Sequence, residues 1–233
     1  MPYQNLTLPE LAKHTGIDAR ELQKLATKGG LPGKQVGGQW RFNRAQLLDW
    51  LQREMHTHLN RRQLASLAAA TSGDAVPVSS MLAPEAVEMT FRARSRSSVP
   101  RELVAIAERS GLVYDPDELI GRLQEREELC STALPGGLAL PHPRQPLPYA
   151  TAEPLLALAR SQAGIPYAAP DGGLTYIFVF ISCHDDRQHL HVLAKLSLMF
   201  QEGLASELFD AESNEEALQL FLEAEQAADA SGA

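Results

Sequence analysis

Apolar and polar positions divide the chain into two parts with different patterns. Between residues 6 and 51, short stretches with helical spacing alternate with glycine turns, in the order helix, turn, helix, hairpin, helix. Thr7, Asp18 and Asn43 each stand where a helix-capping side chain is expected. Gly37-Gly38 separates two strand-like segments, which is typical of a β-hairpin. This part predicts a small, mainly helical domain that carries a hairpin.

After residue 80, helical segments alternate with short, continuous apolar runs, which predicts an α/β layered domain. The small and polar segment AAATSGDAVPVSS, residues 68–80, indicates a linker. We therefore expect domains at 1–67 and 81–227, joined by the linker 68–80 and followed by a tail at 228–233. The expected strands lie at 87–91, 138–141, 155–159 and 174–181. The expected helices lie at 99–109, from Asp115 or Asp117 to about 128, and at 186–201, 204–209 and 214–226.

Charge divides the chain at the same place. The net charge is −8, but residues 1–67 hold ten Lys or Arg and five Asp or Glu, a balance of +5, which leaves −13 for the remainder. The basic part suits a polyanion, and the acidic part would be repelled by it.

The chain has no apolar run of about 18 residues and no signal-peptide pattern, so we expect no membrane insertion. Two cysteines far apart in sequence, Cys130 and Cys183, indicate a reducing, cytoplasmic location.

Residues 6–51 resemble the excisionase/MerR-like winged helix-turn-helix domain. The resemblance is carried by the order of a two-helix unit, a GGLP-type turn, a VGGQWRF hairpin and a capped helix. It implies that the second helix enters the DNA major groove and that the hairpin wing contacts the backbone. Ala19 and Gln39 stand where arginine is common in that family, and the alternative is a retained fold used for protein contacts or dimerisation. Trp40 and Trp50 are expected in the core. The expected DNA contacts are Arg20, Gln23, Lys24, Lys28, Lys34 and Arg41.

A histidine stands at the end of an apolar run in the segment GGLALPHPR, residues 136–144. An apolar run that is followed directly by turn-forming residues predicts a strand, and the side chain after it lies at the edge of the sheet. Pro141 and Pro143 fix their own φ angles and restrict the residues before them, so His142 is held in place. A held histidine is what a nucleophile or a general base requires.

Two blocks of the second part resemble the type 2 enzyme IIA domain of the bacterial sugar phosphotransferase system, the fructose, mannitol and nitrogen-regulatory group. The resemblance covers about residues 78–225. The block LQEREELCSTALPGGLALPHPR is similar to the family's helix ending in Arg-Glu, its Ser-Thr turn and its Gly-Ile-Ala-Ile-Pro-His-Gly strand end. The block FVFISCHDDRQHLHVLAKLSLMF is similar to the family's strand, loop and helix opening with His-Leu-His. The resemblance implies a layered domain with a mixed sheet and flanking helices.

The resemblance places the phosphoryl-accepting histidine at His142, the family's conserved arginine at Arg126 and its second active-site histidine at His189. A phosphoryl acceptor needs a neutral imidazole nitrogen and nearby positive charge for the phosphoryl oxygens. Arg126 offers a planar fork for those oxygens. His189 lies near a predicted helix start, where the helix dipole favours an anion.

Helical spacing favours His189 over its neighbour His191. His189 shares a face with the apolar residues that should pack inward, and His191 points about 200° away at 3.6 residues per turn. The apolar residues on the His189 face are Val192, Leu193, Leu196 and Phe200.

Other interpretations of these residues remain open. Arg126 lies in the charged run 125–128, and the alternative for it is a solvated helix end. Pro143 stands where the family commonly has glycine, which removes a backbone N–H beside His142. Cys183, His184, Asp185, Asp186 and His189 suggest a metal, but their spacing fits no standard ligand pattern, so zinc is a minor alternative. Either aspartate is more simply a helix cap.

The sequence thus predicts a phosphohistidine protein that takes a phosphoryl group from the phosphocarrier HPr or a paralogue, without a cofactor or a metal. An enzyme IIB or another regulated protein, DNA and a second copy of the chain are the other expected partners. Neither a sugar-specific IIB domain nor a membrane IIC domain is expected in this sequence, which favours regulation over bulk sugar uptake. The alternative is a transcription or interaction module whose enzyme IIA-like domain no longer transfers phosphate.

Overall fold

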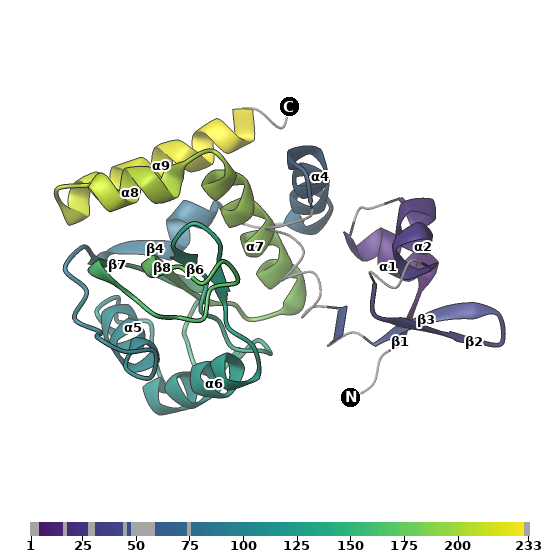
Figure 1. Cartoon of the computed structure of the whole chain (residues 1–233), viewed down its shortest axis with the longest axis horizontal. Coiled ribbons are helices and arrows are strands. Elements are labelled where there is room, and N and C mark those ends of the chain that lie inside the picture. The colour runs from purple at the N-terminus through teal and green to yellow at the C-terminus, as the bar shows by residue number, and fades with distance from the viewer. Residues whose placement is uncertain are drawn as a thin grey trace.

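The computed structural model describes residues 5–15, 18–27, 31–43, 46–47, 59–73 and 76–230 (Figure 1). The elements before residue 75 are β1 (Asn5–Thr7), α1 (Leu8–Thr15), α2 (Ala19–Thr27), β2 (Gly33–Val36), β3 (Gln39–Asn43) and α4 (Arg61–Ser72). They are followed by η1 (Val78–Met81), β4 (Leu82–Glu88), α5 (Val99–Glu108), α6 (Pro116–Leu129), β5 (Ala133–Leu134), β6 (Leu138–Ala139), β7 (Leu155–Ile165), β8 (Thr175–Ser182), α7 (Asp186–Gln201), α8 (Leu204–Asp210) and α9 (Asn214–Ala230).

The N-terminal elements form the predicted helix pair and hairpin. The Thr7 hydroxyl accepts the backbone N–H of Glu10 at 3.4 Å, and the Glu10 carboxylate accepts the backbone N–H of Thr7 at 2.7 Å, which is a capping box. Asp18 accepts the backbone N–H of Arg20 at 2.8 Å at the start of α2. Strands β2 and β3 pair antiparallel around Gly37 and Gly38, whose φ angles of 59° and 78° are those that a two-residue hairpin turn requires.

One feature of this part goes beyond the prediction. Strand β1 pairs with β3 to give a three-stranded sheet in the order β1-β3-β2, and a strand of three residues leaves little periodic signal in a sequence. Asn43 accepts the backbone N–H of Gln46 at 3.2 Å, as expected of a cap, but most of the helix predicted after it, with Trp50, lies outside the described residues. Trp40 is only half-buried and stacks on the fully buried Phe42 with ring centroids 6.0 Å apart.

The C-terminal elements form the predicted α/β layers around a mixed five-stranded sheet in the order β4-β7-β8-β6-β5. The outer pair β4–β7 and the inner pair β6–β8 are parallel, whereas β7–β8 and β5–β6 are antiparallel. Figure 1 shows α5 and α6 on one side of this sheet and α8 and α9 on the other. Among the described helices, none has the length and the apolar character that crossing a membrane requires.

The strand that leads to His142 is shorter than predicted, and its proline explains why. The predicted strand 138–141 is observed as β6, only Leu138–Ala139, because Pro141 has no N–H to donate to a ladder. The pairing nevertheless continues, since the Pro141 carbonyl accepts the backbone N–H of Ile181 at 2.9 Å. The predicted strand 87–91 is shifted as well, because β4 begins at Leu82 and ends at Glu88.

Part of the segment predicted as a linker, residues 68–80, is helical. Residues 68–72 are the last turns of α4, in which the alanines favour a helix and Leu64 and Leu67 are fully buried. Helix α4 packs along α7. Beyond it, the Glu225 carboxylate of α9 accepts the backbone N–H groups of Val78 at 2.7 Å and Ser79 at 2.8 Å. The expected tail is also partly structured, because α9 continues to Ala230. The domain boundaries at 67 and 81 stay predictions.

Candidate phosphoryl-transfer site

The sheet brings the ends of two parallel strands to one edge. Because β6 and β8 are parallel neighbours, with Leu138 opposite Ile177, the residues that follow both strands lie together. The segment after β6 carries His142, and the segment after β8 leads into α7, whose fourth residue is His189. In open α/β sheets this carboxyl edge is where ligands commonly bind.

The structure places the rings of His142 and His189 against each other. Their centroids are 4.8 Å apart, and the ring planes meet at 57°. Both side chains are buried, His142 with 3% and His189 with 5% of its surface exposed. The two histidines that the sequence predicted, 47 positions apart, therefore share one site at the sheet edge.

The imidazole of His142 has a defined orientation. Its Nδ1 lies 2.6 Å from the carbonyl oxygen of Leu140. A carbonyl only accepts hydrogen bonds, so Nδ1 carries the proton and donates it, and the lone pair of the neutral ring is on Nε2. Pro141 and Pro143, on either side of the histidine, are buried as well.

Arg126, the third predicted residue, also reaches this site. It lies in the last turn of α6 with 4% of its surface exposed, so the alternative of a solvated helix end is wrong. Its Nη1 donates to the Cys130 carbonyl at 2.6 Å. Burial, and to a smaller extent the charge of Arg126, lower the pKa of His189 to about 4, so His189 is neutral at pH 7. The site therefore combines an imidazole of fixed orientation, a second imidazole that is neutral at pH 7, and a guanidinium.

The lowered pKa of His189 should make stability fall in acid. Its folded-state pKa is about 4 and the usual value is 6.5, so between these values the unfolded chain binds a proton that the folded chain does not. Stability should then decrease as the pH falls from 6.5 towards 4, by about 1.4 kcal/mol per pH unit from this residue. Urea unfolding at several pH values should show a shallower decrease for His189→Gln than for the wild type. Parallel pH curves would contradict the prediction.

The residues that suggested a metal have other partners. Asp185, not Asp186, caps α7, because its side chain accepts the backbone N–H of Gln188 at 2.8 Å. His184 Nε2 lies 3.2 Å from the Thr151 hydroxyl and 3.1 Å from the Thr151 carbonyl. Cys183 is buried, which raises the pKa of its thiol and disfavours the thiolate that a metal needs. Within the described part of the chain, no group of three or more His, Cys, Asp or Glu side chains could hold a metal ion.

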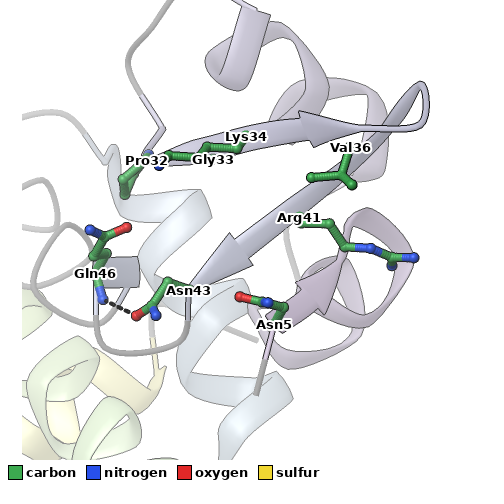
Figure 2. Close-up of a pocket in the computed structure, with 8 residues that line it drawn as sticks. All are labelled: Asn5, Pro32, Gly33, Lys34, Val36, Arg41, Asn43 and Gln46. Atoms are coloured by element: carbon green, nitrogen blue, oxygen red, sulfur yellow. Dashed lines mark hydrogen bonds between the residues drawn. The ribbon is translucent and has the colours of Figure 1, made fainter. Parts of the chain in front are cut away.

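The predicted DNA-contacting residues lie on α2 and on the wing. Arg20, Gln23 and Lys24 are exposed on α2, and Lys28 lies outside the described residues. Lys34 and Arg41 are cross-strand partners in the wing and line a cavity of about 550 Å³ (Figure 2). The other lining residues are Asn5, Pro32, Gly33, Val36, Asn43 and Gln46. Cationic and amide side chains donate hydrogen bonds, so the groups that line this cavity are suited to binding an anionic oxygen.

One buried acid beside the site was missed from the sequence. Glu127 has 5% of its surface exposed and follows Arg126 directly. A signal for it existed, because Glu127 lies four and eight positions after Leu123 and Leu119, both of which are fully buried on the inner face of α6. A carboxylate on an apolar helix face must have polar partners inside the fold.

Comparisons with known proteins identify both parts of the chain. A family model described as "Phosphoenolpyruvate-dependent sugar phosphotransferase system, EIIA 2" matches residues 80–224, and one described as "Helix-turn-helix domain" matches residues 6–55. The class is thus an enzyme IIA domain fused to a helix-turn-helix domain, as the resemblances predicted. The chain belongs to the type 2 enzyme IIA family of the phosphotransferase system.

Relatives and solved structures agree with this membership. The chain is 26% identical over 145 residues to a fructose-specific EIIA component of Haloferax volcanii, which covers 61% of this chain and 92% of that protein. It is 24% identical over 141 residues to a fructose-specific EIIABC component of Bacillus subtilis, covering 59% of this chain but only 22% of that longer protein. The nitrogen regulatory protein IIA-Ntr of Neisseria meningitidis has the same fold, with a TM-score of 0.55 at 23% identity over 61% of this chain and 97% of that one.

Proposed function

We propose that His142 accepts a phosphoryl group on Nε2, from the phosphocarrier HPr or a paralogue. The observation that carries this proposal is the 2.6 Å contact between His142 Nδ1 and the Leu140 carbonyl, which directs the lone pair of the ring to Nε2. During transfer, the bond between phosphorus and the donor nitrogen breaks while the bond to Nε2 forms. The chemistry needs no metal, because positioning and positive charge stabilise a phosphoryl transition state.

Arg126 and His189 have separate roles in this proposal. The Arg126 guanidinium stabilises the negative charge on the phosphoryl oxygens. His189 is neutral before transfer and donates a ring N–H to the same group, from the N-terminal turns of α7, where the helix dipole favours an anion. The phosphoryl group would in turn oppose the lowering of the His189 pKa, because it adds a charge of up to about −2.

In the same proposal, phosphorylation of His142 regulates the helix-turn-helix domain. Helix α4 connects the two parts and is bound to α7 near the proposed site. The Ala68 carbonyl of α4 accepts Nδ1–H of His191 at 2.9 Å, and the Arg187 guanidinium lies so close to Gly73 that a Cβ there would be 2.5 Å from it. From the first turns of α7, His191 is thus hydrogen-bonded to α4, and Arg187 packs closely against the residue that ends α4. A charge added beside His189 acts on the same turns of α7. It therefore changes how strongly α4 is attached to α7.

The first experiment measures phosphorylation of the full chain. The protein is incubated with phosphoenolpyruvate, enzyme I and HPr from the same organism, and its intact mass is recorded. We expect the mass of one phosphoryl group, stable in alkali and lost in acid, as a phosphoramidate is. An unmodified mass, while a known enzyme IIA in the same mixture is phosphorylated, would overturn the proposal.

A second function, a regulator without phosphoryl transfer, is favoured by one specific observation. His142 has 3% of its surface exposed, and the flanking Pro141 and Pro143 are buried. A donor must displace part of this cover before it reaches Nε2. In this alternative the enzyme IIA domain binds a partner protein, such as an enzyme IIB, in an unmodified state.

DNA binding by the first domain should depend on the exposed cations of α2. We expect the affinity for genomic fragments to fall with salt, and Lys24→Ala to make the slope of log K against log[salt] shallower by about one. Lys13→Ala is the matched control, because Lys13 is exposed on α1, the neighbouring helix. Fluorescence anisotropy at several salt concentrations measures both slopes. Equal slopes for the two variants would assign the contact to another surface.

A further inference from the structure

The buried carboxylate of Glu127 binds the turn that follows α6. Its Oε1 accepts the backbone N–H of Thr132 at 3.0 Å and also the Thr132 hydroxyl. Its Oε2 lies 3.5 Å from Nη2 of Arg96, and the same guanidinium donates to the backbone carbonyl of Glu127. One acid thus joins the end of α6, the following turn and the segment before α5.

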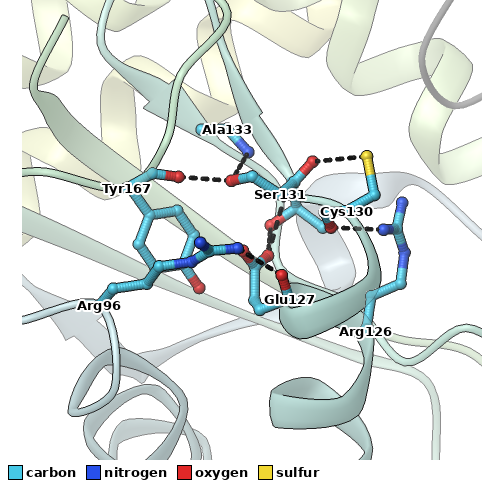
Figure 3. Close-up of polar contacts among 8 residues, drawn as sticks. Arg96, Arg126, Glu127, Cys130, Ser131, Ala133 and Tyr167 are labelled. Atoms are coloured by element: carbon cyan, nitrogen blue, oxygen red, sulfur yellow. Dashed lines mark hydrogen bonds and ion pairs between the residues drawn. The ribbon is translucent and has the colours of Figure 1, made fainter. Parts of the chain in front are cut away.

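Tyr167 completes the surroundings of Glu127. The Arg96 guanidinium lies over the Tyr167 ring, 5.9 Å from its centroid, and the Tyr167 carbonyl accepts the Ser131 hydroxyl at 2.5 Å. The Ser131 hydroxyl also accepts the backbone N–H of Ala133 at 3.1 Å. Burial and the charge of Glu127 raise the pKa of the Tyr167 phenol, so the ring stays neutral. Each of residues 131–133 therefore has a fixed hydrogen-bond partner, and Figure 3 shows the contacts of Ser131 with Tyr167 and Ala133.

This turn is connected to both predicted reacting side chains. On one side, Arg126 Nη1 donates to the Cys130 carbonyl, the first residue of the turn, at 2.6 Å. On the other side, the Thr132 carbonyl accepts the backbone N–H of Leu140 at 3.1 Å, and the Leu140 carbonyl accepts Nδ1–H of His142 at 2.6 Å. The contacts run without a gap from Glu127 through Thr132 and Leu140 to His142.

We propose that Glu127 is a positioning residue, which sets the orientation of His142 and Arg126 relative to each other through the turn 130–133. Arg96 provides opposite charge that offsets part of the cost of burial, although burial still raises the pKa of Glu127 above its usual value. Without such a partner, a buried acid binds a proton, and a protonated acid would have one acceptor fewer for Thr132. The inference rests on the proposed function, because it assigns Glu127 to the same transfer step.

The test compares Glu127→Gln with Glu128→Gln in the full chain. Glu128 is the next residue of α6 and is exposed, so it controls for the loss of one negative charge. The rate of transfer is measured as a function of the concentration of phosphorylated HPr. Since displacement of reacting groups by about 1 Å can cost about 10²-fold in rate, we expect Glu127→Gln to lower kcat by about 10- to 100-fold with KM nearly unchanged. Glu128→Gln should keep both constants.

A second measurement does not depend on transfer. The ¹⁵N shifts of the His142 ring, recorded without a donor, report whether Nδ1 still carries the proton. We expect one Nδ1–H form in the wild type and a mixture of the two neutral tautomers in Glu127→Gln. Thr132→Val, which removes only the hydroxyl donor, should change the shifts and kcat in the same direction by a smaller amount. It serves as the second variant if Glu127→Gln does not fold.

Several outcomes would overturn the inference. They are an unchanged kcat with unchanged ring shifts in a folded variant, a raised KM at constant kcat, or a lowered melting temperature with wild-type kcat at a temperature where the variant is folded. If the wild type itself accepts no phosphoryl group, the proposed function fails. The ring shifts then still decide whether Glu127 orients His142.

Discussion

Replacing His142 with asparagine should abolish phosphorylation of the chain. The asparagine amide nitrogen occupies nearly the position of Nδ1 and can still donate to the Leu140 carbonyl, so the local fold should survive. The variant lacks Nε2, which is the proposed nucleophile. We expect the transfer rate to fall to below about one-thousandth of the wild-type rate, as when other nucleophiles are removed. Intact mass after incubation with phosphoenolpyruvate, enzyme I and HPr measures the loss.

The matched control for this variant is His184→Gln. His184 lies at the same sheet edge but uses Nε2 to contact Thr151, and the glutamine amide occupies nearly that position. This variant should be phosphorylated at the wild-type rate. If His142→Asn is phosphorylated while His184→Gln is not, the acceptor has been assigned to the wrong histidine. If both are phosphorylated normally, neither residue is the acceptor.

The sequence predicted the parts of the fold that depend on local chemistry. Capping side chains at Thr7, Asp115 and Asp185 mark the starts of helices that the structure contains. The glycine pair 37–38 marks the wing hairpin. Such signals act within a few residues, so one sequence is enough to recognise them.

The pairing of His142 with His189 could also be predicted, for a different reason. A strand end and a helix start were each visible, and the resemblance to a known family indicated that they meet. The rings are 4.8 Å apart, and helical spacing correctly separated His189 from His191, which instead contacts Ala68 of α4.

What the sequence missed depends on long-range packing. Helix α4 was predicted in part as a linker, because small residues such as those at 68–72 are compatible with either state until α7 supplies a surface. The partners of Glu127 are equally invisible, since Arg96 and Tyr167 lie 31 and 40 positions away. A polar residue on an apolar face shows that partners exist, but the fold alone determines which residues they are.

Replacing Arg126 with glutamine should slow phosphoryl transfer by about 10²- to 10³-fold, the usual cost of losing a donor that stabilises transition-state charge. Arg126→Lys keeps the charge but not the planar fork, and should fall between this variant and the wild type. Arg122→Gln is the control, because Arg122 is exposed one turn earlier on α6, where it pairs with Glu118 and Glu125. Transfer rates at saturating phosphorylated HPr measure the effect.

The Arg126→Gln variant should also change the pKa of His189, which can be measured independently of phosphoryl transfer. Because the charge of Arg126 contributes to the low pKa of His189, Arg126→Gln should raise that pKa from about 4 towards 6.5, although burial keeps it below 6.5. Arg122→Gln should leave it unchanged. An NMR titration of the His189 ring measures this shift without a phosphoryl donor. A slow Arg126→Gln variant with an unchanged His189 pKa would mean that Arg126 acts on the donor protein rather than inside the site, because a cation beside His189 must affect its titration.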